Sequence, residues 1–117
     1  MILHLTKDLM LSSTASATAR ACGKEYRFAG SLVKLDAAMQ KDEFNLLLVD
    51  LQTPGIDLEK MTEIISQSFT GEGRKAIAYA QHVEVDLLEN AKQCGFESIM
   101  TRGQFNSGLQ QLFSNLN

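Results

Sequence analysis

The sequence contains no tryptophan, a single proline, and only two cysteines and two histidines. The cysteines, Cys22 and Cys94, form no CxxC motif, and neither histidine has a partner at metal-binding spacing. The sequence therefore offers no pattern for a structural zinc site or a disulfide framework. We expect both cysteines to be small buried side chains in a reducing compartment.

Long apolar runs and basic segments are missing as well. No apolar run approaches the roughly 20 residues that a membrane-spanning helix needs, and the N-terminus lacks the charged segment and apolar core of a signal peptide. The formal net charge is −3, and no basic stretch with interleaved aromatic residues occurs. These absences argue against a membrane or a nucleic acid as partner and favour a cytoplasmic location.

In other respects the composition of the chain is ordinary. It has 117 residues, of which 44% are apolar and 21% charged. That length suits one domain with one hydrophobic core. Because no repeat, low-complexity tract or linker interrupts it, we expect residues 1–117 to form a single domain.

Short apolar runs alternate with segments of helical periodicity along the whole chain. The runs predict strands over residues 2–5, 25–29, 46–50, 76–80 and 96–100. Apolar residues at three- and four-residue spacing predict helices over 10–22, 32–39, 58–69, 83–94 and 105–116. The first of these helices has three candidate N-caps, Thr6, Asp8 and Ser12. This alternation predicts an α/β fold, a five-stranded parallel sheet with helices on both faces.

The third predicted strand ends on a carboxylate. Asp50 closes the apolar run "NLLLVD", and a turn through Pro54 and Gly55 leads to Asp57, which we expect to cap the next helix. Ligands and catalytic groups of open parallel sheets lie at the carboxyl ends of the strands. Asp50 is therefore the first candidate for a functional residue.

This segment resembles the centre of the receiver domains of two-component response regulators, the CheY-like family. The family pattern D-x-x-M-P-x-M-D-G is matched by Asp50, Pro54 and Asp57. The later segment "AKQCGFESIMTRG" is similar to the family's A-x-x-A-G-A-x-x-Y-L-x-K-P, with Arg102 at the lysine. The resemblance covers essentially the whole chain and implies a flavodoxin-like (βα)5 fold with strand order 2-1-3-4-5.

The resemblance also implies a phosphorylation site. In the family, an aspartate accepts the phosphoryl group beside a Mg²⁺ ion held partly by two acids after the first strand, and a hydroxyl and a lysine complete the site. Asp50 takes the acceptor position. The acidic pair falls on Leu5 and Thr6 or, after a shift of one or two residues, on Lys7 and Asp8, so only Asp8 and Asp50 remain as metal ligands. The expected supporting residues are Thr6, Lys7, Asp8, Ala80 in place of the hydroxyl and Arg102 in place of the lysine.

These departures predict an atypical receiver, a pseudo-receiver without efficient Mg²⁺-dependent phosphorylation. We expect Asp50 to pair with Lys7 or Arg102. By resemblance, residues 83–116, which hold the fourth helix, fifth strand and fifth helix, bind a signalling protein, a histidine kinase or a second copy. Two alternatives stay open: a conventional receiver phosphorylated on Asp50, and a sensor of small molecules or anions at the strand ends. No pattern predicts an enzyme acting on a diffusible substrate.

Overall fold

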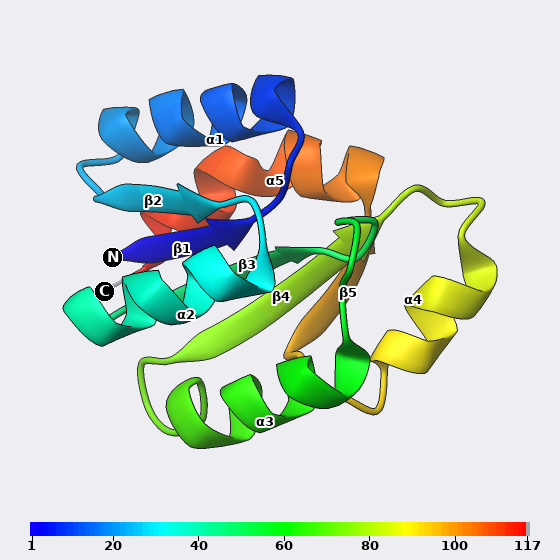
Figure 1. The fold of residues 1–117 in the computed structure, drawn as a ribbon. Coiled ribbons are helices and arrows are strands. Elements are labelled where there is room, and N and C mark those ends of the chain that lie inside the picture. Colours follow the sequence, from blue (N-terminus) through cyan, green and yellow to red (C-terminus); the bar gives the residue numbers. More distant parts are fainter. Residues whose placement is uncertain (117) are drawn as a thin grey trace.

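Five strands alternate with five helices in the computed structural model, which describes residues 1–116 (Figure 1). The alternation predicted from the sequence is confirmed, and the ends of the elements shift by a few residues. The elements are β1 (Ile2–Leu5), α1 (Leu9–Ala21), β2 (Tyr26–Ala29), α2 (Leu32–Lys41), β3 (Leu46–Asp50), α3 (Leu58–Ser68), β4 (Lys75–Ala80), α4 (Val85–Ala91), β5 (Ser98–Thr101) and α5 (Arg102–Ser114).

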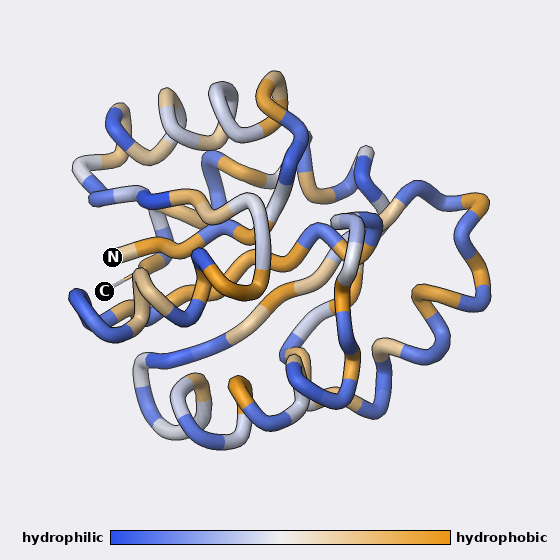
Figure 2. The backbone as a smooth tube through the Cα atoms, viewed as in Figure 1, coloured by the Kyte–Doolittle hydropathy of each residue, from blue (hydrophilic) through white to orange (hydrophobic). Residues whose placement is uncertain are grey.

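The strands form one parallel sheet in the order β2-β1-β3-β4-β5, as the resemblance implies. Helices α1 and α5 cover one face, and α2, α3 and α4 cover the other (Figure 1). The hydrophobic residues concentrate along the central strands, and the outer turns of the helices are hydrophilic (Figure 2). This is the three-layer α/β architecture, and its edge strands are β2 and β5.

Strand β3 is buried along its whole length. Successive side chains of a strand point to opposite faces of the sheet. Leu47 and Val49 accordingly join the core on the α2–α3 side, and Leu46 and Leu48 join the core on the α1–α5 side. Asp50 follows the second set, so its carboxylate lies at the carboxyl end of the sheet on the α1–α5 side.

Helix α5 begins three residues earlier than the periodicity predicts. Thr101 is its N-cap: the Thr101 hydroxyl accepts a hydrogen bond from Gln104 N, and the Gln104 side chain accepts one from Thr101 N. This reciprocal capping box fixes the first turn of a helix before its apolar stripe starts. Arg102 is therefore the first residue of α5, and that position determines where its side chain can reach.

The remaining expectations about burial hold in part. Cys94 is buried, but Cys22 is only half-buried, and both are free thiols.

The helices settle two further expectations. Asp8 is the N-cap of α1, so it is the residue that caps this helix among the three candidates. Among the helices of residues 1–116, none combines the length and the apolar content that crossing a bilayer requires.

Candidate functional site

The Asp50 carboxylate is almost enclosed, with 6% of the residue exposed. Its Oδ2 accepts a hydrogen bond of 2.8 Å from the Thr6 hydroxyl, and its Oδ1 accepts one of 3.0 Å from Gln52 N. Thr6 follows β1, the strand next to β3, and is fully buried. Both oxygens of the candidate acceptor are therefore engaged by groups of the protein itself.

The turn after β3 holds Asp50 from the backbone side. The Thr53 amide and hydroxyl both donate to the Asp50 carbonyl oxygen, at 3.0 and 2.7 Å. Gly55 adopts a positive φ of 78°, which glycine tolerates at no steric cost. Asp57 then caps α3 by accepting from Glu59 N and from the next amide along, as the sequence predicts.

The residues predicted to replace the acidic pair point in three different directions. Thr6 faces Asp50. Lys7 is exposed and lines a separate hollow beside Gly30 and Lys34. Asp8 turns to α1, where Oδ1 accepts from Leu11 N, and its Oδ2 forms an ion pair with Arg102.

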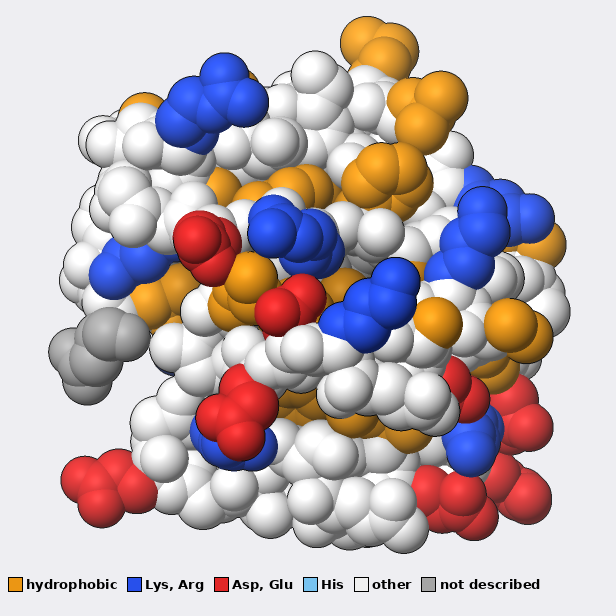
Figure 3. All heavy atoms as spheres, turned by 60° about the vertical axis from the view of Figure 1, so that its left-hand side comes forward, with side chains coloured by type: hydrophobic (Ala, Val, Ile, Leu, Met, Phe, Trp, Pro, Cys, Tyr) orange, Lys and Arg blue, Asp and Glu red, His pale blue; other side chains and the backbone are white. Residues whose placement is uncertain are grey.

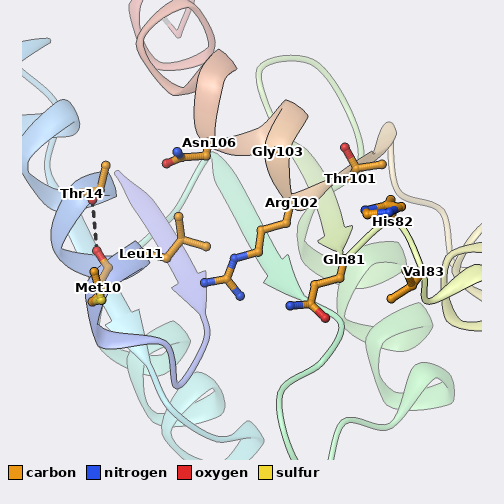
Figure 4. Close-up of a pocket in the computed structure, with 10 residues that line it drawn as sticks. All are labelled: Met10, Leu11, Thr14, Gln81, His82, Val83, Thr101, Arg102, Gly103 and Asn106. Atoms are coloured by element: carbon orange, nitrogen blue, oxygen red, sulfur yellow. Dashed lines mark hydrogen bonds between the residues drawn. The ribbon is translucent and has the colours of Figure 1, made fainter.

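The expected ion pair of Asp50 with Lys7 or Arg102 is therefore wrong. The capping box at Thr101 makes Arg102 the first residue of α5, on the α1–α5 side of the sheet. From there its side chain extends toward the loop after β1 (Figure 4), where it forms an ion pair with Asp8. The cation that the resemblance places beside the acceptor neutralises the cap of a neighbouring helix instead.

Ala80, at the predicted hydroxyl position, packs into the core on the α2–α3 side. The residue after it, Gln81, takes part in a bridge between two loops. Gln81 N donates to Gln52 Oε1 at 2.8 Å, and Gln52 Nε2 donates to Gln81 Oε1 at 3.5 Å. The loop after β3 is thus joined to the loop after β4 beside Asp50. Sequence reasoning missed this bridge, since two glutamines 29 residues apart form no recognisable pattern.

The acidic residues do not gather into a metal centre. Across residues 1–116, no three His, Cys, Asp or Glu side chains converge in a way that suits an ion. Mg²⁺ prefers a near-octahedral shell of hard oxygen ligands. Asp8 is occupied by Arg102 and the α1 cap, and Asp50 by Thr6 and Gln52. The residues present do not fit the magnesium site that the resemblance implies for Asp8 and Asp50.

A chain of buried polar groups lies behind the carboxylate and was also missed. His4 Nε2 is 2.7 Å from the Tyr79 hydroxyl, and His4 Nδ1 is 2.7 Å from the Tyr26 hydroxyl, which in turn lies 3.0 Å from the Ser12 hydroxyl. Burial lowers the pKa of His4 to about 3, so the imidazole is neutral. The only signal in the sequence was a histidine inside the apolar run "ILHL".

Tyr79 connects this chain to the site. Burial raises its pKa far above the ordinary tyrosine value, the negative charge of Asp50 raises it further, and a hydrogen bond with Thr6 acts in the opposite direction. The phenol is stacked on Phe105 of α5, with ring centroids 4.0 Å apart. Tyr79 is therefore held as a neutral hydroxyl between the acceptor position and the His4 network.

A groove of about 820 Å³ opens beside the site, between the beginnings of α1 and α5 and the loop after β4 (Figure 4). Met10 and Leu11 line one side, and Val83 lies across from them. Arg102 is the charged residue that lines the groove, and its ion pair with Asp8 neutralises that charge. The groove therefore has apolar walls and one cation that is already paired.

Comparison with known proteins identifies the fold. No protein-family model matches the sequence, and no curated protein matches it. Solved structures do: the receiver domain of NtrX from Brucella abortus has a TM-score of 0.78 at 17% identity, over 96% of this chain and 93% of that one. The beryllofluoride-activated NtrC4 receiver domain dimer gives 0.74 at 18%, over 96% and 94%. CheY4 of Vibrio cholerae gives 0.77 at 17%, over 95% and 92%. The chain has the receiver-domain fold.

Proposed function

We propose that this chain is an atypical receiver-like domain of two-component signalling that acts by binding other proteins, without efficient Mg²⁺-dependent phosphorylation of Asp50. One observation carries the proposal: both Asp50 oxygens accept hydrogen bonds from the protein, and no cation pairs with them among residues 1–116. We place it in the cytoplasm and assign it no catalysis on a diffusible substrate.

The chemistry of phosphoryl transfer supports this reading. Transfer to a carboxylate needs an oxygen lone pair aligned for in-line attack, and it needs positive groups that stabilise charge on the transferred oxygens. Here Thr6 occupies Oδ2, Gln52 N occupies Oδ1, and Ala80 offers no hydroxyl. Arg102 is committed to Asp8. A phosphoryl group at Asp50 would displace these partners without gaining a metal ion or a cation in return.

Residues 83–116 are the surface that we assign to a protein partner, either a signalling protein or a second copy. The receiver domain of NtrC4 is known as a dimer in its beryllofluoride-activated form. The outer positions of α4 here are exposed and mildly acidic, with Asp86 and Glu89 among them. A surface of this kind suits recognition that does not depend on chemistry at Asp50.

The direct test uses beryllofluoride, a stable mimic of the phosphoryl group, and acetyl phosphate as a small donor. Amide spectra of the ¹⁵N-labelled protein and its intact mass are recorded with and without Mg²⁺, for the natural chain and for Asp50→Asn. We expect no Mg²⁺-dependent adduct and identical spectra. An adduct that requires Mg²⁺ and disappears in Asp50→Asn would establish the conventional phospho-acceptor instead.

A restored variant makes the negative result informative. Thr6→Asp removes the buried donor to Asp50 Oδ2 and adds a second carboxylate, a hard oxygen ligand for Mg²⁺, beside it. We expect this variant to respond to beryllofluoride with Mg²⁺ where the natural chain does not. The sensor alternative is checked on the same samples: thermal stabilisation by phosphate or sulfate that is lost in Arg102→Ala would favour it.

A further inference from the structure

The charges of this chain are segregated along its sequence. Residues 1–41 contain six Lys and Arg against three Asp and Glu, whereas residues 42–117 contain five against eleven. The first segment builds β1, α1, β2 and α2, so one edge of the sheet carries a net positive charge in a chain whose net charge is −3.

The ion pairs increase this difference in charge between the two segments, because they involve cations of the second segment only. Within residues 1–116, the five ion pairs use all five Lys and Arg after residue 41: Lys60, Arg74, Lys75, Lys92 and Arg102. None of the six earlier cations takes part in an ion pair of this described part of the chain. No ion pair of residues 1–116 therefore compensates the positive charge at the β2 edge.

The uncompensated charge lies beside exposed apolar side chains. A groove of about 630 Å³ runs between α1 and β2, and we call it the basic groove. Arg20 and Arg27 line it together with Leu9 and Phe28, which are 70% and 52% exposed. Figure 3 shows hydrophobic side chains gathered in one region of this face, with basic side chains next to them. An occupant of the basic groove needs carboxylates and an apolar side chain.

The same chain presents such a segment at the other edge of the sheet. Residues 82–91, which we call the acidic segment, contain no Lys or Arg. Val83 and Val85 are 65% and 67% exposed, and Glu84 and Asp86 take part in no ion pair of the described residues. Exposed valines flanked by carboxylates without an ion pair complement exposed Leu9 and Phe28, whose neighbouring Arg20 and Arg27 form no ion pair within residues 1–116.

We propose that the acidic segment of one molecule docks into the basic groove of a second copy. Within one molecule the contact is impossible, because the basic groove lies at the β2 edge and α4 lies beyond β4 at the opposite side of the sheet (Figure 1). The contact is heterologous, so each pair leaves one basic groove and one acidic segment free. Association then continues past the dimer. The inference does not rest on the phosphorylation state of Asp50.

Sedimentation equilibrium of the full chain over a wide concentration range tests this. We expect the weight-average mass to rise beyond that of a dimer and to fall back toward the monomer in about 1 M NaCl, where the Debye length is only about 3 Å. Arg20→Glu/Arg27→Glu and Glu84→Lys/Asp86→Lys each weaken association at least roughly tenfold, because like charges then face each other. Mixing these two variants restores it, since each supplies the surface that complements the other.

Matched controls separate this contact from general charge effects. Lys41→Glu/Arg74→Glu changes the net charge by the same amount at residues that belong to neither surface, and association should persist. A natural chain that stays monomeric overturns the proposal. A mass that stops at the dimer and ignores Arg20→Glu/Arg27→Glu also overturns it, and points to a symmetric dimer through residues 83–116. Binding of anionic vesicles by the basic groove in place of self-association overturns it in favour of a lipid surface.

Discussion

His4 makes the folded protein sensitive to acid. Its imidazole is fully buried between β1 and the α1–α5 layer, and both ring nitrogens lie 2.7 Å from tyrosine hydroxyls, those of Tyr26 and Tyr79. A neutral imidazole has one donor and one acceptor nitrogen, which these two hydroxyls satisfy. A protonated ring would place an uncompensated charge in the core, and burial accordingly lowers the pKa of His4 to about 3.

The size of the effect follows from linkage. In the unfolded chain a histidine has a pKa of about 6.5. Between about pH 6.5 and the folded-state pKa of about 3, the unfolded chain binds a proton that the folded chain does not, so stability falls as the pH falls. Between about pH 7.5 and pH 5 the expected loss in the free energy of unfolding is about 2 kcal/mol.

Urea unfolding followed by far-ultraviolet circular dichroism at these two pH values measures that loss. His4→Gln removes the titrating group and should flatten the dependence, whatever its own stability. His82→Gln removes the exposed histidine and should leave the dependence as it is in the natural chain. The reasoning is refuted if His4→Gln retains the full pH dependence, because the proton uptake would then belong to another group.

Three further changes test the site and its supports. Thr6→Val keeps the shape of the side chain but removes the hydroxyl that donates to the buried Asp50 carboxylate. We expect the free energy of unfolding to fall by about 2 kcal/mol, which lowers Tm by about 8 °C. A decrease in Tm below about 2 °C would contradict this expectation. Thr101→Ala removes the capping box and should lower Tm by about 4 °C. Arg102→Ala should cost at most about 1 kcal/mol by urea unfolding, because its ion pair with Asp8 is partly open to solvent.

The three central strands, β1, β3 and β4, were predictable because they are buried. The run "LLLVD" is apolar from its first residue to Val49, and the predicted strand over 46–50 matches β3 at both ends. Strand β5 shows the limit: its residues are all only half-buried, and the structure places it at Ser98–Thr101 where the pattern predicts 96–100. When an edge strand is only weakly buried, its own apolar pattern does not fix its ends, and the neighbouring elements determine its register.

The site was predictable in position and not in its contacts. Asp50 lies at the end of β3, as inferred, but its partner is Thr6 and not a cation. The error came from the start of α5. Periodicity reports where a helix becomes apolar, whereas Thr101 and Gln104 carry the capping signature that starts the helix before that point. Reading that signature would have placed Arg102 in the first turn and away from Asp50.

The hydrogen bonds of Asp50 are those of a well-satisfied buried carboxylate at the carboxyl end of β3. A buried carboxylate needs donors to replace the water it loses. Thr6 and Gln52 N provide them, and the same Thr6 hydroxyl accepts from Asp8 N, so one side chain joins the end of β1 both to β3 and to the cap of α1. These bonds tie three elements together at the carboxyl end of the sheet. They also give both oxygens of the buried Asp50 carboxylate a donor from the protein.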